Sequence, residues 1–106
     1  MPDDYYLFKL GGQTSLITSV MVSLWGNKVL IECVYNPTER LPYVLVFQDC
    51  RDIMWTVHDS EKLHEMEADL IGFSLGVESH QKAAVITTDI FELSIIYGSF
   101  FLQKDW

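Results

Sequence analysis

Apolar and polar residues alternate along much of the chain, in runs that are short enough for β-strands. The clearest run is FELSIIY at residues 91–97, whose odd positions are all large and apolar. Successive side chains of a strand point to opposite faces, so a period of two places these residues on one side. We expect a buried strand here.

The pattern changes on both sides of this strand. Apolar positions are even at Ala84 and Ile86 but odd from Phe91 onward, so the alternation shifts near residues 88–89. This predicts a bulge, corner or tight turn, which we expect to carry the chain from one sheet to another. After the strand, Gly98 and Ser99 have the chemistry of a two-residue hairpin turn, and we expect residues 100–102 to fold back and pair.

Similar runs fill most of the chain and are separated by turn residues. Gly26 and Asn27 predict a hairpin between runs 16–25 and 28–35, run 43–48 is apolar on both faces and is expected to be central, and YYLFKL at 5–10 also reads as a strand. We predict a single all-β domain over residues 1–106, an antiparallel β-sandwich or small open barrel of seven to nine short strands. The expected core residues are Val20, Val22, Val29, Ile31, Leu45, Phe47, Ile53, Trp55, Phe73, Ile86, Phe91, Leu93 and Ile95.

One segment departs from strand patterning, HDSEKLHEMEAD at 58–69. Asp59 or Ser60 is suited to cap a helix, and Leu63 and Met66 are three residues apart on one helical face. The apolar stripe is narrow, and isolated helices of this length are marginal. We expect at most one short helix near residues 60–67, with a single turn or an irregular loop as the alternatives.

The net charge of the chain restricts the possible partners more than its overall composition does. The chain has 15 acidic residues against 7 basic ones, a net charge of −8. Such a field repels nucleic-acid phosphates and anionic lipids and attracts basic proteins, so we expect no nucleic acid and no membrane among the partners.

Much of the acidic excess falls in residues 49–69, which contain seven acidic residues and only two basic ones, Arg51 and Lys62. A solvated surface is the plain explanation of such a run. The alternative is a partner-binding surface, for which the candidate residues are Asp49, Asp52, Asp59, Glu61, Glu65, Glu67 and Asp69.

Several common motifs for catalysis are missing from the sequence: it has no glycine-rich phosphate loop, no CxxC and no HExxH. We therefore predict no catalytic residue and no cofactor. The weak alternative is Cys50 as a nucleophile beside Arg51, with one of the three histidines as its base. Cys33 and Cys50 are expected to be free thiols, as is usual in a reducing compartment.

A metal site is a second weak alternative. If residues 60–67 were helical, Glu61, His64 and Glu65 would share one face, with His58 nearby. Carboxylate and imidazole ligands of this kind suit a divalent metal, although short acidic segments often contain a histidine without binding one.

The C-terminal residues raise a third possibility. Phe100 and Phe101 are adjacent, so in a strand they face opposite sides, and Trp106 follows. These residues either pack against two layers of one chain or form a self-association surface in a homodimer.

Three hypotheses for function follow. The first is a small acidic, non-enzymatic binding or adaptor domain, such as an inhibitor or immunity-type protein, that docks on a basic protein. The second is a metal-dependent enzyme or metal-binding domain that uses His58, His64 and nearby carboxylates, and the third is a self-associating structural subunit. Because the N-terminal residues lack the cationic and apolar regions of a signal peptide, we expect a cytoplasmic location.

Overall fold

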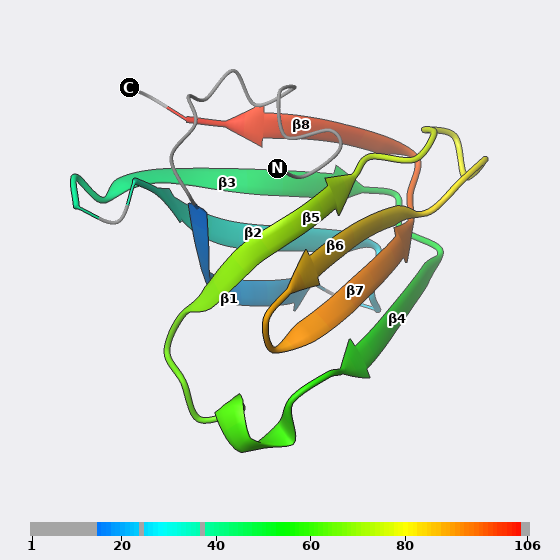
Figure 1. The fold of residues 1–106 in the computed structure, drawn as a ribbon. Coiled ribbons are helices and arrows are strands. Elements are labelled where there is room, and N and C mark those ends of the chain that lie inside the picture. Colours follow the sequence, from blue (N-terminus) through cyan, green and yellow to red (C-terminus); the bar gives the residue numbers. More distant parts are fainter. Residues whose placement is uncertain (1–14, 24, 37, 105–106) are drawn as a thin grey trace.

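The protein is described by a computed structural model, which covers residues 15–23, 25–36 and 38–104. These residues are nearly all in antiparallel strands, so the predicted all-β class is confirmed (Figure 1). The strands are β1 (Ser15–Ser23), β2 (Lys28–Tyr35), β3 (Leu41–Gln48), β4 (Asp52–Val57), β5 (Ala68–Ser74), β6 (Ala84–Thr88), β7 (Phe91–Ile96) and β8 (Ser99–Gln103), with a 3₁₀ turn at Ser60–Lys62.

The eight strands form one sheet in the order β4-β7-β6-β5-β1-β2-β3-β8. The sheet bends into two layers: β8, β3, β2 and β1 form one, and β5, β6, β7 and β4 cross in front of it (Figure 1). The layers are joined where β1 meets β5, through only two residue pairs, Leu16 with Asp69 and Ile17 with Ala68. The result is a small sandwich whose two edge strands are β4 and β8.

The core lies between the layers, where the inward rows of the strands meet. Phe47 of β3 contacts Tyr97 edge to face, with ring centroids 5.0 Å apart, and its ring also lies 4.9 Å from that of Phe100. The buried hydroxyl of Tyr97 donates a hydrogen bond to the carbonyl oxygen of Leu75 at 2.6 Å. Alternation therefore predicts most of the core correctly: Val29, Ile31, Leu45, Phe47, Phe73, Ile86, Phe91, Leu93 and Ile95 are all buried.

The parity change near residue 88 is a tight turn, as predicted, but the chain does not change layers there. β6 and β7 are neighbours in the same layer. Thr88 builds the turn: its buried hydroxyl accepts hydrogen bonds from the amides of Ile90 and Phe91 at 3.0 and 2.9 Å and donates to the carbonyl of Phe91 at 3.0 Å.

The crossing between layers occurs instead at Gly98, and the expected hairpin with residues 100–102 is wrong. β8 pairs with β3, where Phe100 lies opposite Phe47. Gly98 does not have a positive φ; it is crowded, because a Cβ there would lie 2.9 Å from the Cβ of Asp49. Close approach of two segments far apart in the sequence explains this glycine, and local turn chemistry does not reveal it.

Several local predictions are confirmed. Gly26, at φ +94°, lies in the hairpin between β1 and β2, and β3 is central between β2 and β8. In the 58–69 segment the described structure has one 3₁₀ turn, with Asp59 as its N-cap. The strand expected at residues 5–10 lies outside the described residues.

Two expected core residues are exposed. Val22 on β1 is 51% exposed and Trp55 on β4 is 47% exposed, while Val20 and Ile53 are only partly buried against the core. The reason is the topology: β1 pairs with β5 only as far as Ile17, and β4 is the edge of its layer. The inner faces of these two strands therefore extend beyond the part of the sandwich that is closed.

Candidate functional site

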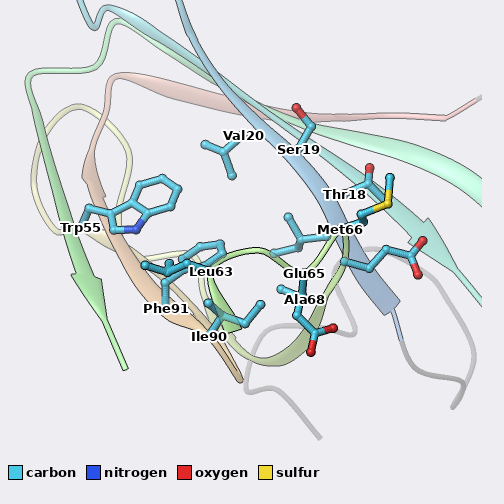
Figure 2. A pocket seen from close by; sticks show the side chains of 12 residues that line it. Thr18, Ser19, Val20, Trp55, Leu63, Glu65, Met66, Ala68, Ile90 and Phe91 are labelled. Atoms are coloured by element: carbon cyan, nitrogen blue, oxygen red, sulfur yellow. The ribbon is translucent and has the colours of Figure 1, made fainter. Parts of the chain in front are cut away.

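A groove of about 210 Å³ lies where β1 and β4 leave the closed interior. One wall is the stretch of β1 around its bulge at residues 17–19, and the other consists of β4 and the β6–β7 turn (Figure 2). The connector between β4 and β5, residues 58–67, completes the groove. The lining residues are Ile17, Thr18, Ser19, Val20, Trp55, Leu63, Glu65, Met66, Glu67, Ala68, Ile90 and Phe91.

Trp55 is the largest side chain of the groove. Its ring is stacked on that of Phe91, with centroids 4.6 Å apart and planes 21° from parallel. Figure 2 shows Trp55 and Val20 bordering the same hollow, with Leu63 near Phe91. Since Phe91 holds one face of the indole ring, the remaining exposed surface of Trp55 has a defined position.

The connector supplies two more apolar side chains. Leu63 is 57% exposed and Met66 is 87% exposed. Isolated exposed apolar residues are common, but these two line one hollow together with Trp55. The groove is thus an apolar surface whose inner end is continuous with the core.

Polar contacts hold the connector in place. The Asp59 carboxylate accepts a hydrogen bond from the amide of Glu61 at 3.1 Å, and Lys62 forms an ion pair with Asp89 at 3.4 Å. Asp89 also accepts a hydrogen bond from the amide of Asp69 at 2.9 Å. These contacts tie the connector to the β6–β7 turn and so position Leu63 and Met66.

The predicted partner-binding acids separate into two groups. Glu65 and Glu67 line the groove, and Glu67 forms an ion pair with Arg40. Asp59 and Glu61 lie in the 3₁₀ turn, and Asp69 is exposed on β5. All five belong to the connector end of β4.

Asp49 and Asp52 lie at the opposite end of β4, about 20 Å away along its six residues. Asp52 is exposed. Asp49 contacts other residues of the fold: its Oδ1 lies 3.4 Å from Nε of Arg51, and its backbone carbonyl oxygen lies 2.8 Å from Nε2 of His80. The seven acids are thus two groups at the ends of a strand and not one continuous patch.

Asp49 and His80 mark a corner where segments distant in sequence meet. Asp49, Ser79 and His80 all have positive φ, at 55°, 61° and 63°. The amides of Ser79 and His80 donate to the carbonyls of Gly98 and Tyr97 at 2.9 and 2.8 Å. These contacts fasten the β5–β6 turn to the point where the chain changes layers, which is a structural role.

Both cysteines are free and buried. Burial raises the pKa of the Cys33 thiol to about 12, and burial also raises the pKa of Cys50, whose thiol donates to the carbonyl of Phe47 at 3.5 Å. A nucleophilic cysteine needs its thiolate. The environment of Cys50 opposes that form.

The metal-site candidates are not brought together. Across residues 15–104, apart from positions 24 and 37, no three histidine, cysteine or acidic side chains are grouped so as to hold a metal ion. His58, Glu61, His64 and Glu65 are all exposed along the connector, which has one 3₁₀ turn where a longer helix was needed to align them.

The C-terminal aromatic residues have different environments. Phe100 packs against the core, near Phe47 and Phe73, while Phe101 on the other face of β8 is 44% exposed. Trp106 lies outside the described residues. The self-association hypothesis stays a prediction, with Phe101 as its exposed described residue.

Comparison of the sequence with protein-family models and with curated protein sequences gives no match. Within the described residues, no helix is both long and apolar enough to cross a membrane.

The sequence pattern does not reveal the groove, because Trp55 occupies a position that alternation assigns to the core, and Leu63 and Met66 form only a narrow helical stripe. A signal was present. Leu63 and Met66 are large apolar residues, three positions apart, in the most acidic segment of the chain. A segment that serves only as a solvated surface does not need such side chains.

Proposed function

We propose that this chain is a non-enzymatic binding domain that docks on a basic protein partner through the groove between β1 and β4, as an adaptor or an inhibitor or immunity-type protein would. One observation carries the proposal: Trp55, Leu63 and Met66 gather their exposed surface around one hollow. Apolar side chains clustered in a concave, positioned site are typical of recognition surfaces.

The charge around the groove favours a basic partner. Glu65 and Glu67 lie on its rim, Asp59 and Glu61 are on the adjoining turn, and the chain as a whole carries −8. Opposite charges raise the association rate and exclude acidic competitors. A partner that presents apolar side chains flanked by lysine or arginine fits both features.

The apolar contacts alone support only a weak complex. Completing the burial of Trp55, Leu63 and Met66, which are already partly buried, contributes on the order of 3 to 5 kcal/mol. Association costs at least about 4 kcal/mol in lost freedom of motion. Charge attraction and further polar contacts must therefore add to the apolar groove.

The test uses a synthetic nine-residue peptide, KKVTVTVKK, and its acidic counterpart EEVTVTVEE, with binding followed by the fluorescence of Trp55. Trp25→Phe and Trp106→Phe leave Trp55 as the single reporter. We expect the basic peptide to shift the Trp55 emission to the blue and the acidic peptide to leave it unchanged. Raising the salt from 0.05 to 0.5 M should weaken binding about tenfold, because it screens the charges.

Two charge reversals separate local from overall attraction. Glu65→Lys on the rim and Glu32→Lys on the outer face of β2 change the net charge equally. We expect about tenfold weaker binding for Glu65→Lys and less than twofold for Glu32→Lys. Equal effects, or binding that is insensitive to salt, would contradict the proposal.

A further inference from the structure

The outer edge of β4 has no neighbouring strand among the described residues, where β4 pairs only with β7. Alternate residues of an antiparallel strand direct their backbone N–H and C=O groups toward the same neighbour. The amide of His58 donates to the carbonyl of Ile90 at 2.8 Å, on the β7 side. Residues 52, 54 and 56 are separated from His58 by even numbers of positions, so their backbone groups also point toward β7. The N–H and C=O groups of Ile53, Trp55 and Val57 therefore point to the open edge.

The other edge of the sheet is protected differently. On β8, the amide of Phe100 donates a hydrogen bond to the carboxylate of Glu78 at 2.9 Å. In the described part of the chain, no side chain makes such a bond to the backbone of Ile53, Trp55 or Val57. β4 also has neither lysine nor proline, the residues that commonly block edge pairing.

The edge and the groove are one feature. Ile53, Trp55 and Val57, whose backbone groups point outward, also place their side chains on the inner face, where Trp55 lines the groove. A strand added beside β4 would have its own inward side chains next to these residues. It would cover the exposed surface of Trp55 while it completes the edge.

Building on the proposed function, we infer that the partner binds by strand addition: an extended segment of about six residues pairs with the outer edge of β4 and covers the groove. Its alternate residues are apolar and contact Trp55 and Val57. Its ends carry lysine or arginine, because acids lie at both ends of β4, Asp52 at the start and Asp59 beyond the end. Main-chain hydrogen bonds supply the affinity that the apolar contacts lack.

Charge also selects between possible occupants. A second copy of this chain would bring another −8 to an edge with acids at both ends. Like charges placed together oppose association. A basic segment of a different protein is the occupant that the electrostatics favour.

The test measures amide hydrogen exchange by NMR on the full chain, with KKVTVTVKK as the probe. We expect the peptide to slow exchange at Ile53, Trp55 and Val57 at least tenfold and to leave Phe101 on β8 unchanged. A peptide of the same sequence with N-methylated valine and threonine residues cannot form a ladder, and we expect at least tenfold weaker binding.

The failure of strand addition can be told apart from the failure of the proposed function. Equal binding of the two basic peptides, with a blue shift of Trp55 in both, would overturn strand addition and leave the proposed function standing. No binding of either peptide would overturn both. If these three amides are protected from exchange without peptide, and the protection increases with protein concentration, a second copy is the occupant and the inference is overturned. Exchange at these amides that becomes faster when residues 1–14 are deleted would also overturn the inference.

Discussion

The inner face of this sandwich is closed under β3 and β7 and open between β1 and β4, although the sequences of the two regions look alike. Phe47 and Trp55 are both large aromatic residues at inward positions of strands. Phe47 is fully buried, with Tyr97 and Phe100 against it, whereas Trp55 is half exposed and stacked on Phe91. The same alternation therefore produces core where a second layer covers the strand and an exposed apolar surface where it does not.

The largest expected difference between the regions is in truncation. Phe47→Ala should lower the free energy of unfolding by about 4 kcal/mol, because it empties a closed site. Trp55→Ala should cost only about 1 to 2 kcal/mol although the side chain is larger, since half of its surface is already in water. Urea denaturation of both variants measures the contrast, and equal losses would mean that the groove is covered in solution.

Two turns beside the groove should differ next, because the hydroxyl that holds one of them is buried and the other turn is exposed. Thr88→Val removes the hydroxyl that bonds three backbone groups in the β6–β7 turn, and we expect a loss of about 3 kcal/mol because the amides of Ile90 and Phe91 lose their partner. Asp59→Ala removes the cap of the exposed 3₁₀ turn and should cost about 1 kcal/mol. Thr88→Ser keeps the hydroxyl and is the control; if it is as unstable as Thr88→Val, the hydrogen bonds are not the cause.

Alkaline pH should destabilise the closed interior through Cys33. Burial raises the pKa of this thiol from 9.0 to about 12 in the folded chain. Above pH 9 the unfolded chain loses the thiol proton while the folded chain keeps it, so the contribution to stability is full below pH 9 and falls as the pH rises toward 12. Between pH 9 and 10.5 the loss is about 2 kcal/mol at 1.4 kcal/mol per unit.

The control for this loss of stability at alkaline pH is Cys33→Val, which keeps an apolar side chain and removes the titrating thiol. Denaturation series at several pH values should show a shallower alkaline decline for the variant than for the unsubstituted protein. Parallel declines would assign the pH dependence to other groups.

The smallest expected effect on stability is at the open region. Met66→Ser should change the free energy of unfolding by less than about 0.5 kcal/mol, because the side chain is 87% exposed. It should nevertheless weaken binding of KKVTVTVKK about threefold, through loss of an apolar contact of about 0.6 kcal/mol. Met21→Ser, on the outer face of β1, is the matched control and should leave binding unchanged.

Local pattern was sufficient for the strands and for several turns. Alternation at residues 29–33 and 91–95 predicts the strands and their buried faces, Gly26 predicts the β1–β2 hairpin, and Asp59 predicts a cap. Each depends on groups within a few positions of one another. Local propensity acts over that distance.

The route of the chain between layers could not be predicted in this way. Gly98 resembles a hairpin glycine, but its requirement comes from Asp49, which is 49 positions away in the sequence. The pairing of β8 with β3 likewise depends on which strand edge is free once the other strands have paired. Contacts between distant segments leave no periodic signal.

The sequence by itself determined that this chain is all-β and that it carries a net charge of −8, because the alternating rows and the charge both follow from composition and order. Only the tertiary structure decided which apolar rows become core and which become surface. β1 leaves β5 after Ile17 and β4 ends its layer, so Val22 and Trp55 have no opposite layer to cover them. Coverage is a property of two strands together, and neither strand carries it in its own pattern.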